Sequence, residues 1–151
     1  MAARVNFPKG LPRFKMRRKV VARLLNDMAD TAVNQIYNDT QQGKDIDGKK
    51  FKKLKVSTAR AKRKKGQPVK HLIATGLMSR VHKSKKASSV SLRAEVSVAK
   101  ARDDIAEYHN EGEGNLPKRE FFGVGKPLES KLDKVVKLKL EKLIKTTWKK
   151  R

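Results

Sequence analysis

Two stretches of the chain repeat their apolar residues with the period of an α-helix. From about Phe14 to Tyr37 these residues fall at offsets of 0, 3, 4, 7, 11 and 15, which place them on one stripe of a helix. The first stripe consists of Val21, Leu24, Leu25, Met28, Ala32 and Ile36. A second stripe follows Pro127, a residue suited to the first turn of a helix. It consists of Leu128, Leu132, Val136, Leu140, Leu143, Ile144 and Trp148. The pattern therefore predicts two long amphipathic helices.

Alternating residues in the middle of the chain indicate a small antiparallel sheet. Apolar residues occupy every second position from Val90 to Val98, which is typical of a half-buried strand. Residues 71–80 are expected to form a turn of helix that leads into the partner strand. A turn at residues 85–89 would join the two strands.

Capping and helix-breaking residues set the expected ends of the helices. Residues 38–40 and Gly43 are expected to end the first long helix. Ser57 is a suitable N-cap for a short basic helix that Gly66 would end. Another short helix is expected over residues 105–110, just before a pair of glycines.

This order of elements predicts the α+β class, with a small antiparallel sheet packed against two long helices. A chain of 151 residues has the size of one domain, which we expect to span residues 14–151. Residues 1–13 contain two prolines and a glycine, which favour an extended N-terminal arm over a helix. Phe7 and Leu11 of this arm have no periodic partners within the chain. We therefore expect them to contact a neighbouring subunit.

The sequence offers little catalytic or membrane chemistry. Its longest apolar runs are three residues, which excludes a membrane-spanning helix and a secretory signal core, so no membrane partner is expected. There is no cysteine, and the phosphate-loop, dinucleotide and nucleophile-elbow motifs are missing. A small nuclease or metal site using Asp103, Asp104 and His109 is one alternative, although such acids usually form a solvated loop. We expect no enzyme activity, metal or cofactor.

The charge of the chain is distributed unevenly. Lys and Arg number 39 against 15 Asp and Glu, a formal net charge of +24. Ten of the seventeen residues at 49–65 are basic and none is acidic, whereas five acids gather at 103–113. This asymmetry suits contact with nucleic acid, pairing of opposite charges between subunits, or a merely solvated face. The candidate nucleic-acid contacts are Lys49, Lys50, Lys52, Lys53, Lys62, Arg63, Lys64 and Lys65.

An apolar loop precedes the last helix. Residues 115–125 hold Arg119, Phe121 and Phe122 between a proline and a glycine. Adjacent residues of an extended segment point in opposite directions, so one phenylalanine is expected to fill the core and the other to face a partner. Apolar residues and an arginine at a loop tip are typical of a binding surface. We therefore expect these three residues to form a subunit or partner interface.

Four short motifs follow one another between residues 44 and 150. They are Gly48–Leu54 (GKKFKKL) followed by Ser57 and Thr58, Leu72–Met78 (LIATGLM), Ile105–Gly112 (IAEYHNEG) and Asn115–Gly123 (NLPKREFFG). In their order and spacing they resemble the bacteriophage virion-morphogenesis family of tail-completion and neck proteins. Ala74 stands where that family often has an acid, and Tyr108 is displaced from the position of the family's tyrosine.

The resemblance implies a small α+β structural subunit without enzymatic activity. Such a subunit assembles as a homo-oligomeric ring at the head–tail connection, as a neck or a tail-completion or terminator protein. Its expected partners are other phage neck, portal-side or tail proteins, and packaged DNA passes nearby. It would be found in the virion, and in the host cytoplasm during assembly. The alternative is a stand-alone nucleic-acid-binding protein without sequence preference, which would account for the charge but would not require the apolar loop.

Overall fold

The computed structural model describes residues 16–74, 80–99, 103–114 and 116–148, so the predicted N-terminal arm with Phe7 and Leu11 lies outside the described residues. Over the described part, four helices accompany a two-stranded antiparallel sheet, which confirms the α+β class. The elements are α1 (Arg18–Gln42), α2 (Val56–Lys64), β1 (Val81–Lys85), β2 (Glu95–Val98), α3 (Asp103–Glu111) and α4 (Lys126–Trp148).

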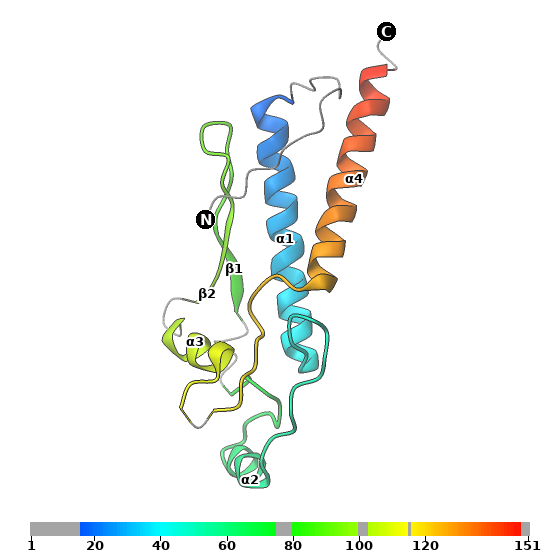
Figure 1. Ribbon diagram of the computed structural model, residues 1–151. Coiled ribbons are helices and arrows are strands. Elements are labelled where there is room, and N and C mark those ends of the chain that lie inside the picture. Colours follow the sequence, from blue (N-terminus) through cyan, green and yellow to red (C-terminus); the bar gives the residue numbers. More distant parts are fainter. Residues whose placement is uncertain (1–15, 75–79, 100–102, 115, 149–151) are drawn as a thin grey trace.

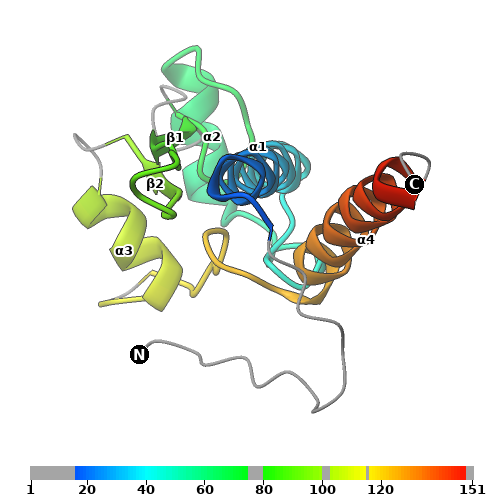
Figure 2. The same cartoon turned by 90° about the horizontal axis from the view of Figure 1, so that it is seen from above.

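Helix α1 lies at the centre of the arrangement. The β1–β2 hairpin packs along one side of α1, and α4 packs along another (Figures 1 and 2). Helix α1 therefore lies between the sheet and α4. Polar contacts between the long helices include the ion pair of Lys139 with Asp27 and a hydrogen bond from the Lys131 ammonium to the amide oxygen of Gln35.

The first helix continues beyond its predicted end. Thr40 is almost completely buried, and its hydroxyl donates to the carbonyl of Ile36 (2.8 Å), so its polar group is satisfied within the helix. Gly43 then ends α1 in the left-handed conformation (φ 68°), and its N–H donates to the carbonyl of Thr40 (3.1 Å). Gly43 therefore ends the helix, as predicted, whereas residues 38–40 belong to it.

The hairpin is shorter than the alternation of apolar residues predicts. Strand β2 begins at Glu95, and Val90 is 87% exposed, so the apolar residues before Glu95 do not belong to the strand. The register pairs Val81 with Val98. The turn expected at residues 85–89 is replaced by a longer connection, where the Ser88 hydroxyl accepts bonds from the amides that follow and forms a local turn.

The short helices follow the prediction apart from one cap. Helix α3 covers the predicted residues 105–110, and α2 ends just before Gly66, which has a φ of 64°. Ser57 is not the N-cap of α2, because the helix begins at Val56 and its cap position is Lys55, which makes no capping bond through its side chain.

A small apolar cluster joins four separate segments of the chain. It contains Phe51, Val98, Ala106 and Phe121, with Leu72 and Phe122 packed against it. The side-chain oxygen of Asn110 accepts hydrogen bonds from the amides of Phe121 (3.0 Å) and Phe122 (3.1 Å). These bonds hold the loop before α4 against α3 and position its side chains.

Candidate interaction surfaces

The basic segment 49–65 is exposed as the sequence suggests. Helix α2 lies at one end of the molecule (Figure 1), and none of its residues is buried. Seven of the eight candidate nucleic-acid contacts face the solvent, namely Lys49, Lys50, Lys52, Lys53, Arg63, Lys64 and Lys65. No acid of the segment neutralises them, because the segment contains none. This surface can attract a polyanion without reading its sequence.

Lys62 has a different role from its neighbours. Its ammonium donates to the carbonyls of Pro68 (3.3 Å), Lys70 (2.6 Å) and Ile73 (2.5 Å). An ammonium has three N–H groups, so these bonds use all of them. Burial lowers the pKa of Lys62, and the charge of Arg119 lowers it further. Lys62 therefore holds residues 68–73 against α2 and is no longer a candidate contact for nucleic acid.

The apolar loop presents less surface than expected. Phe121 is 2% exposed and fills the core of this subunit, and Arg119 is 8% exposed. Phe122 is half-buried, so it is the one predicted loop contact that keeps substantial surface for a partner. A partner contact at Phe122 stays a prediction. One phenylalanine of the pair fills the core, as predicted, and it is Phe121; Phe121 and Arg119 are both buried within the subunit, so neither offers the exposed surface expected of an interface residue.

Arg119 lies among three other groups that can carry positive charge. Its backbone N–H donates to the carbonyl of His109 (2.7 Å), which places α3 beside the loop. Burial and the charge of Arg119 lower the pKa of His109. Burial also lowers the pKa of His71, and the charges of Arg119 and Lys62 add to this effect. The pKa of Arg119 itself is lowered by burial.

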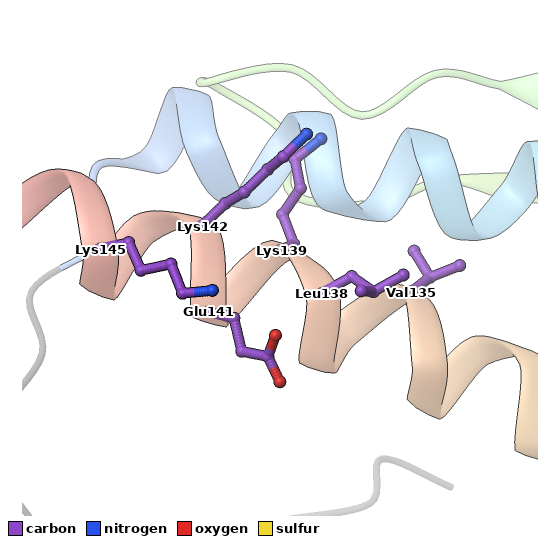
Figure 3. Close-up of a pocket in the computed structure, with 6 residues that line it drawn as sticks. All are labelled: Val135, Leu138, Lys139, Glu141, Lys142 and Lys145. Carbon is purple, nitrogen blue, oxygen red and sulfur yellow. The ribbon is translucent and has the colours of Figure 1, made fainter.

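Helix α4 exposes apolar side chains on more than one side. The predicted stripe is buried at Leu128, but its C-terminal half is exposed at Leu140 and Ile144. Leu138, which lies outside the stripe, is 64% exposed. Val135 and Leu138 line a hollow together with three lysines of α4, and Glu141, which also lines it, points away from α1 (Figure 3). Apolar area of this kind on a helix is typical of a protein contact.

The acids on and after α3 form a separate exposed surface. Its members are Asp104, Glu107, Glu111 and Glu113. Within the described part of the chain, none of these four carboxylates has an ion pair, although the molecule carries a large excess of Lys and Arg. The described residues also hold no group of three His, Asp or Glu side chains placed to bind one metal ion. The acidic surface therefore has charge available for a partner.

Neither the α4 face nor the cluster around Arg119 was found from the sequence. An isolated leucine outside the stripe, Leu138, was the available signal for the first. The second joins Lys62, His71, His109 and Arg119 from distant segments, and no spacing rule connects them. None of the described helices is both long and apolar enough to cross a membrane. Comparisons with protein families, with characterised proteins and with solved structures gave no match to this chain.

Proposed function

We propose that this chain is a structural subunit of a homo-oligomeric ring at a phage head–tail connection. The ring would join the tail to the head as a neck or tail-completion protein and let DNA pass. The order of the four motifs supports the class of protein. The distribution of charge and apolar area over the described residues supports the ring.

One observation carries the proposal: opposite kinds of surface lie on opposite sides of the subunit. Helix α3 with its unpaired carboxylates lies on one side of α1, and α4 lies on the other (Figures 1 and 2). Helix α4 contains seven lysines against three acids, besides its exposed apolar residues. A contact between two different surfaces repeats from copy to copy and closes into a ring when the rotation permits.

The two kinds of contact would contribute differently to assembly. Exposed ion pairs contribute about 0–1 kcal/mol each, so the carboxylates of α3 and the lysines of α4 mainly set orientation and speed of encounter. Burying a leucine or isoleucine side chain completely contributes about 1.5–3 kcal/mol. Leu138 lies on the same side of α4 as Lys134 and Lys145, so it is expected to supply much of the affinity when a second copy covers it.

Exchanging the charges between the two surfaces tests this proposal. Lys134→Glu with Lys145→Glu, or Glu107→Lys with Glu111→Lys, should each weaken assembly because like charges then face each other. The molecule with all four changes should assemble again, because the new glutamates of α4 can then pair with the new lysines of α3. Lys64→Glu with Lys65→Glu is the matched control on α2 and should assemble normally.

Mass photometry or light scattering over a range of protein concentration and salt provides the readout. Ring-sized particles that depend on the four charges support the proposal. A wild-type protein that stays monomeric throughout, or single-surface variants that assemble like the wild type, would contradict it. An absence of rescue in the four-change molecule would show that these two surfaces do not face each other.

A second candidate function is stand-alone binding of nucleic acid without sequence preference. The exposed basic side chains of segment 49–65 favour it, because they occupy one end of the molecule with no acid among them. A monomer that binds any duplex tightly at low salt and loses it at moderate salt would support this function over the ring.

A further inference from the structure

Arg119 is a buried cation without a counter-charge. Its residue is 8% exposed, and its Nε has no hydrogen-bond partner. Among the residues that the structure describes, no carboxylate forms an ion pair with its guanidinium. A guanidinium remains protonated in proteins, so it cannot relieve this burial by losing its proton. Burying an unpaired charge costs several kcal/mol, about the order of a domain's whole stability.

The groups around Arg119 add positive potential instead of cancelling it. Lys62 has committed its N–H groups to three carbonyls, so it contributes charge but no further donor. His71 donates from Nε2 to the carbonyl of Lys52 (3.0 Å), and its Nδ1 faces Gly43. His109 differs, because its Nδ1 is buried and has no partner. Two neighbouring residues, Arg119 and His109, therefore each leave a buried ring or guanidinium nitrogen unused.

We propose that this cluster binds a small oxyanion of the phosphate or sulfate class, with Arg119 and His109 as hydrogen-bond donors. The guanidinium presents N–H groups in a planar fork that matches two oxygens of such an ion. The Nδ1 of His109 donates when it carries the proton, and Lys62 and His71 supply additional positive potential. The anion would neutralise the buried charge and tie α3, the loop before α4 and residues 62–73 together.

The depth of Arg119 favours a free ion over a phosphate of the DNA backbone. A duplex lies on a surface and meets side chains that reach it, as Arg63 and Lys64 can. Arg119 is nearly enclosed by protein, so a compact ion reaches it more readily than a polymer does. The site does not depend on ring assembly, and a single subunit contains all four residues.

Thermal unfolding in inorganic phosphate, with chloride of equal ionic strength as reference, is the direct test. The wild-type Tm should rise with the logarithm of the phosphate concentration above Kd, by roughly 3–6 °C when phosphate exceeds its Kd tenfold. Arg119→Met removes the charge but keeps an unbranched side chain. It should be as stable as the wild type in chloride or more so, and should lose the response to phosphate. Arg63→Met, the exposed control on α2, should keep that response.

A measurement on the wild-type protein keeps the proposal testable if Arg119→Met does not fold. The chain has three histidines, and His82 on β1 is exposed. In an NMR titration with sulfate, the ring signals of His109 should shift most, and its pKa should rise. His71 should shift less and His82 not at all. Equal shifts of all three rings, or none, would overturn the proposal.

The unfolding data contain a second decisive outcome. A phosphate response in Arg119→Met as large as that of the wild type would overturn the proposal. Short duplex DNA distinguishes the source of the oxyanion. Equal duplex affinity of Arg119→Met and the wild type identifies a free ion as the ligand. A loss of duplex affinity greater than that of Arg63→Met identifies a backbone phosphate bound by the same site.

Discussion

The side-chain amide of Asn26 forms two hydrogen bonds with the backbone of Ala87. Its Nδ2 donates to the carbonyl of Ala87 (2.9 Å), and its Oδ1 accepts from the N–H of Ala87 (2.9 Å). The side-chain amide of Asn26 thus makes the two backbone hydrogen bonds that a neighbouring strand would otherwise make with Ala87. Ala87 is buried, so this pair ties the connection between β1 and β2 to the middle of α1.

Removing the amide should destabilise the subunit. Asn26→Ala leaves both backbone groups of Ala87 without their partner, which costs about 1–3 kcal/mol in the free energy of unfolding. Asn34→Ala on the exposed side of α1 is the control and should have little effect. Urea denaturation measures both variants. If Asn26→Ala is as stable as Asn34→Ala, water satisfies Ala87 and the pair does not hold the hairpin.

Gly125 and Ile46 define a close backbone contact that admits no side chain. A Cβ on Gly125 would lie 2.1 Å from the carbonyl oxygen of Ile46, closer than any real contact. Ile46 is itself fixed by a hydrogen bond from its N–H to the carbonyl of Glu120 (2.9 Å). Gly125→Ala should therefore destabilise the protein by at least about 2 kcal/mol, because backbone must move.

Gly66→Ala is the matched control for the effect of a new methyl group. Gly66 has a positive φ of 64°, but nothing lies near its missing Cβ. The free energy of unfolding of this variant should fall by about 1–2 kcal/mol, which is the conformational cost of an alanine in the left-handed region. Urea midpoints compare the two. A Gly125→Ala variant no less stable than Gly66→Ala would show that the segment around Ile46 yields easily.

Phe121 and Phe122 should respond differently to truncation. Phe121→Ala removes a ring from the core and should cost about 3–5 kcal/mol, enough to unfold much of the protein. Phe122→Ala should cost less, since that residue is half-buried. Loss of assembly in a Phe121 variant therefore reports on folding. A folded Phe122→Ala that assembles normally would exclude Phe122 from the subunit interface.

Burial of the two histidines predicts lower stability in acid. The folded-state pKa of His109 and of His71 lies below the unfolded value of about 6.5. The unfolded chain therefore binds more protons below that pH, and stability falls as the pH decreases from about 6.5 toward the folded pKa values. Arg119 and Lys62 are the charged groups that contribute to these shifts.

Urea unfolding over this pH range, for the wild type and His109→Gln, measures the effect. His109→Gln should lose part of the pH dependence, and His82→Gln, which alters an exposed ring, should keep it. Sulfate should reduce the loss of stability in acid, because an anion beside Arg119 favours protonated His109. An identical pH dependence in His109→Gln and the wild type would contradict the prediction.

The sequence predicts elements that one stretch of chain can specify by itself. The helical periods of α1 and α4 and the helix end at Gly43 are local patterns, and both helices and this end are present. The strand expected from Val90 to Val98 forms only over Glu95–Val98, because alternation describes which side a residue faces but not whether a partner strand is present. Beyond the paired strands, the backbone of Ala87 is hydrogen-bonded to the side chain of Asn26 instead. These two residues are 61 positions apart, so a local pattern in the sequence does not reveal their contact.

The candidate surfaces show the same limit. The basic segment 49–65 could be read directly, because its charge lies in one continuous run. The burial of Arg119 could not be read in this way, since the loop that carries it is bonded to α3, through His109 and Asn110. Lys62 is indistinguishable from Lys64 in the sequence, and only the fold places three carbonyls around its ammonium.

Substitutions of Lys62 and of its neighbours should therefore have different effects on DNA binding and on stability. Replacing Arg63, Lys64 and Lys65 by Gln should make the negative slope of log K against log salt shallower by about 2–3, if each residue contacts one phosphate. The free energy of unfolding measured in urea should stay nearly unchanged. Lys62→Gln should do the reverse: it should lower the free energy of unfolding by about 1–3 kcal/mol, because three carbonyls lose a charged donor, and leave the salt slope unchanged. Fluorescence anisotropy with two duplexes of different sequence measures the slope and the lack of sequence preference together.

A shallower slope in Lys62→Gln with unchanged stability would show that its ammonium leaves the carbonyls to bind phosphate. An unchanged slope in the triple variant would mean that the exposed charges of α2 serve a protein partner or only the solvent.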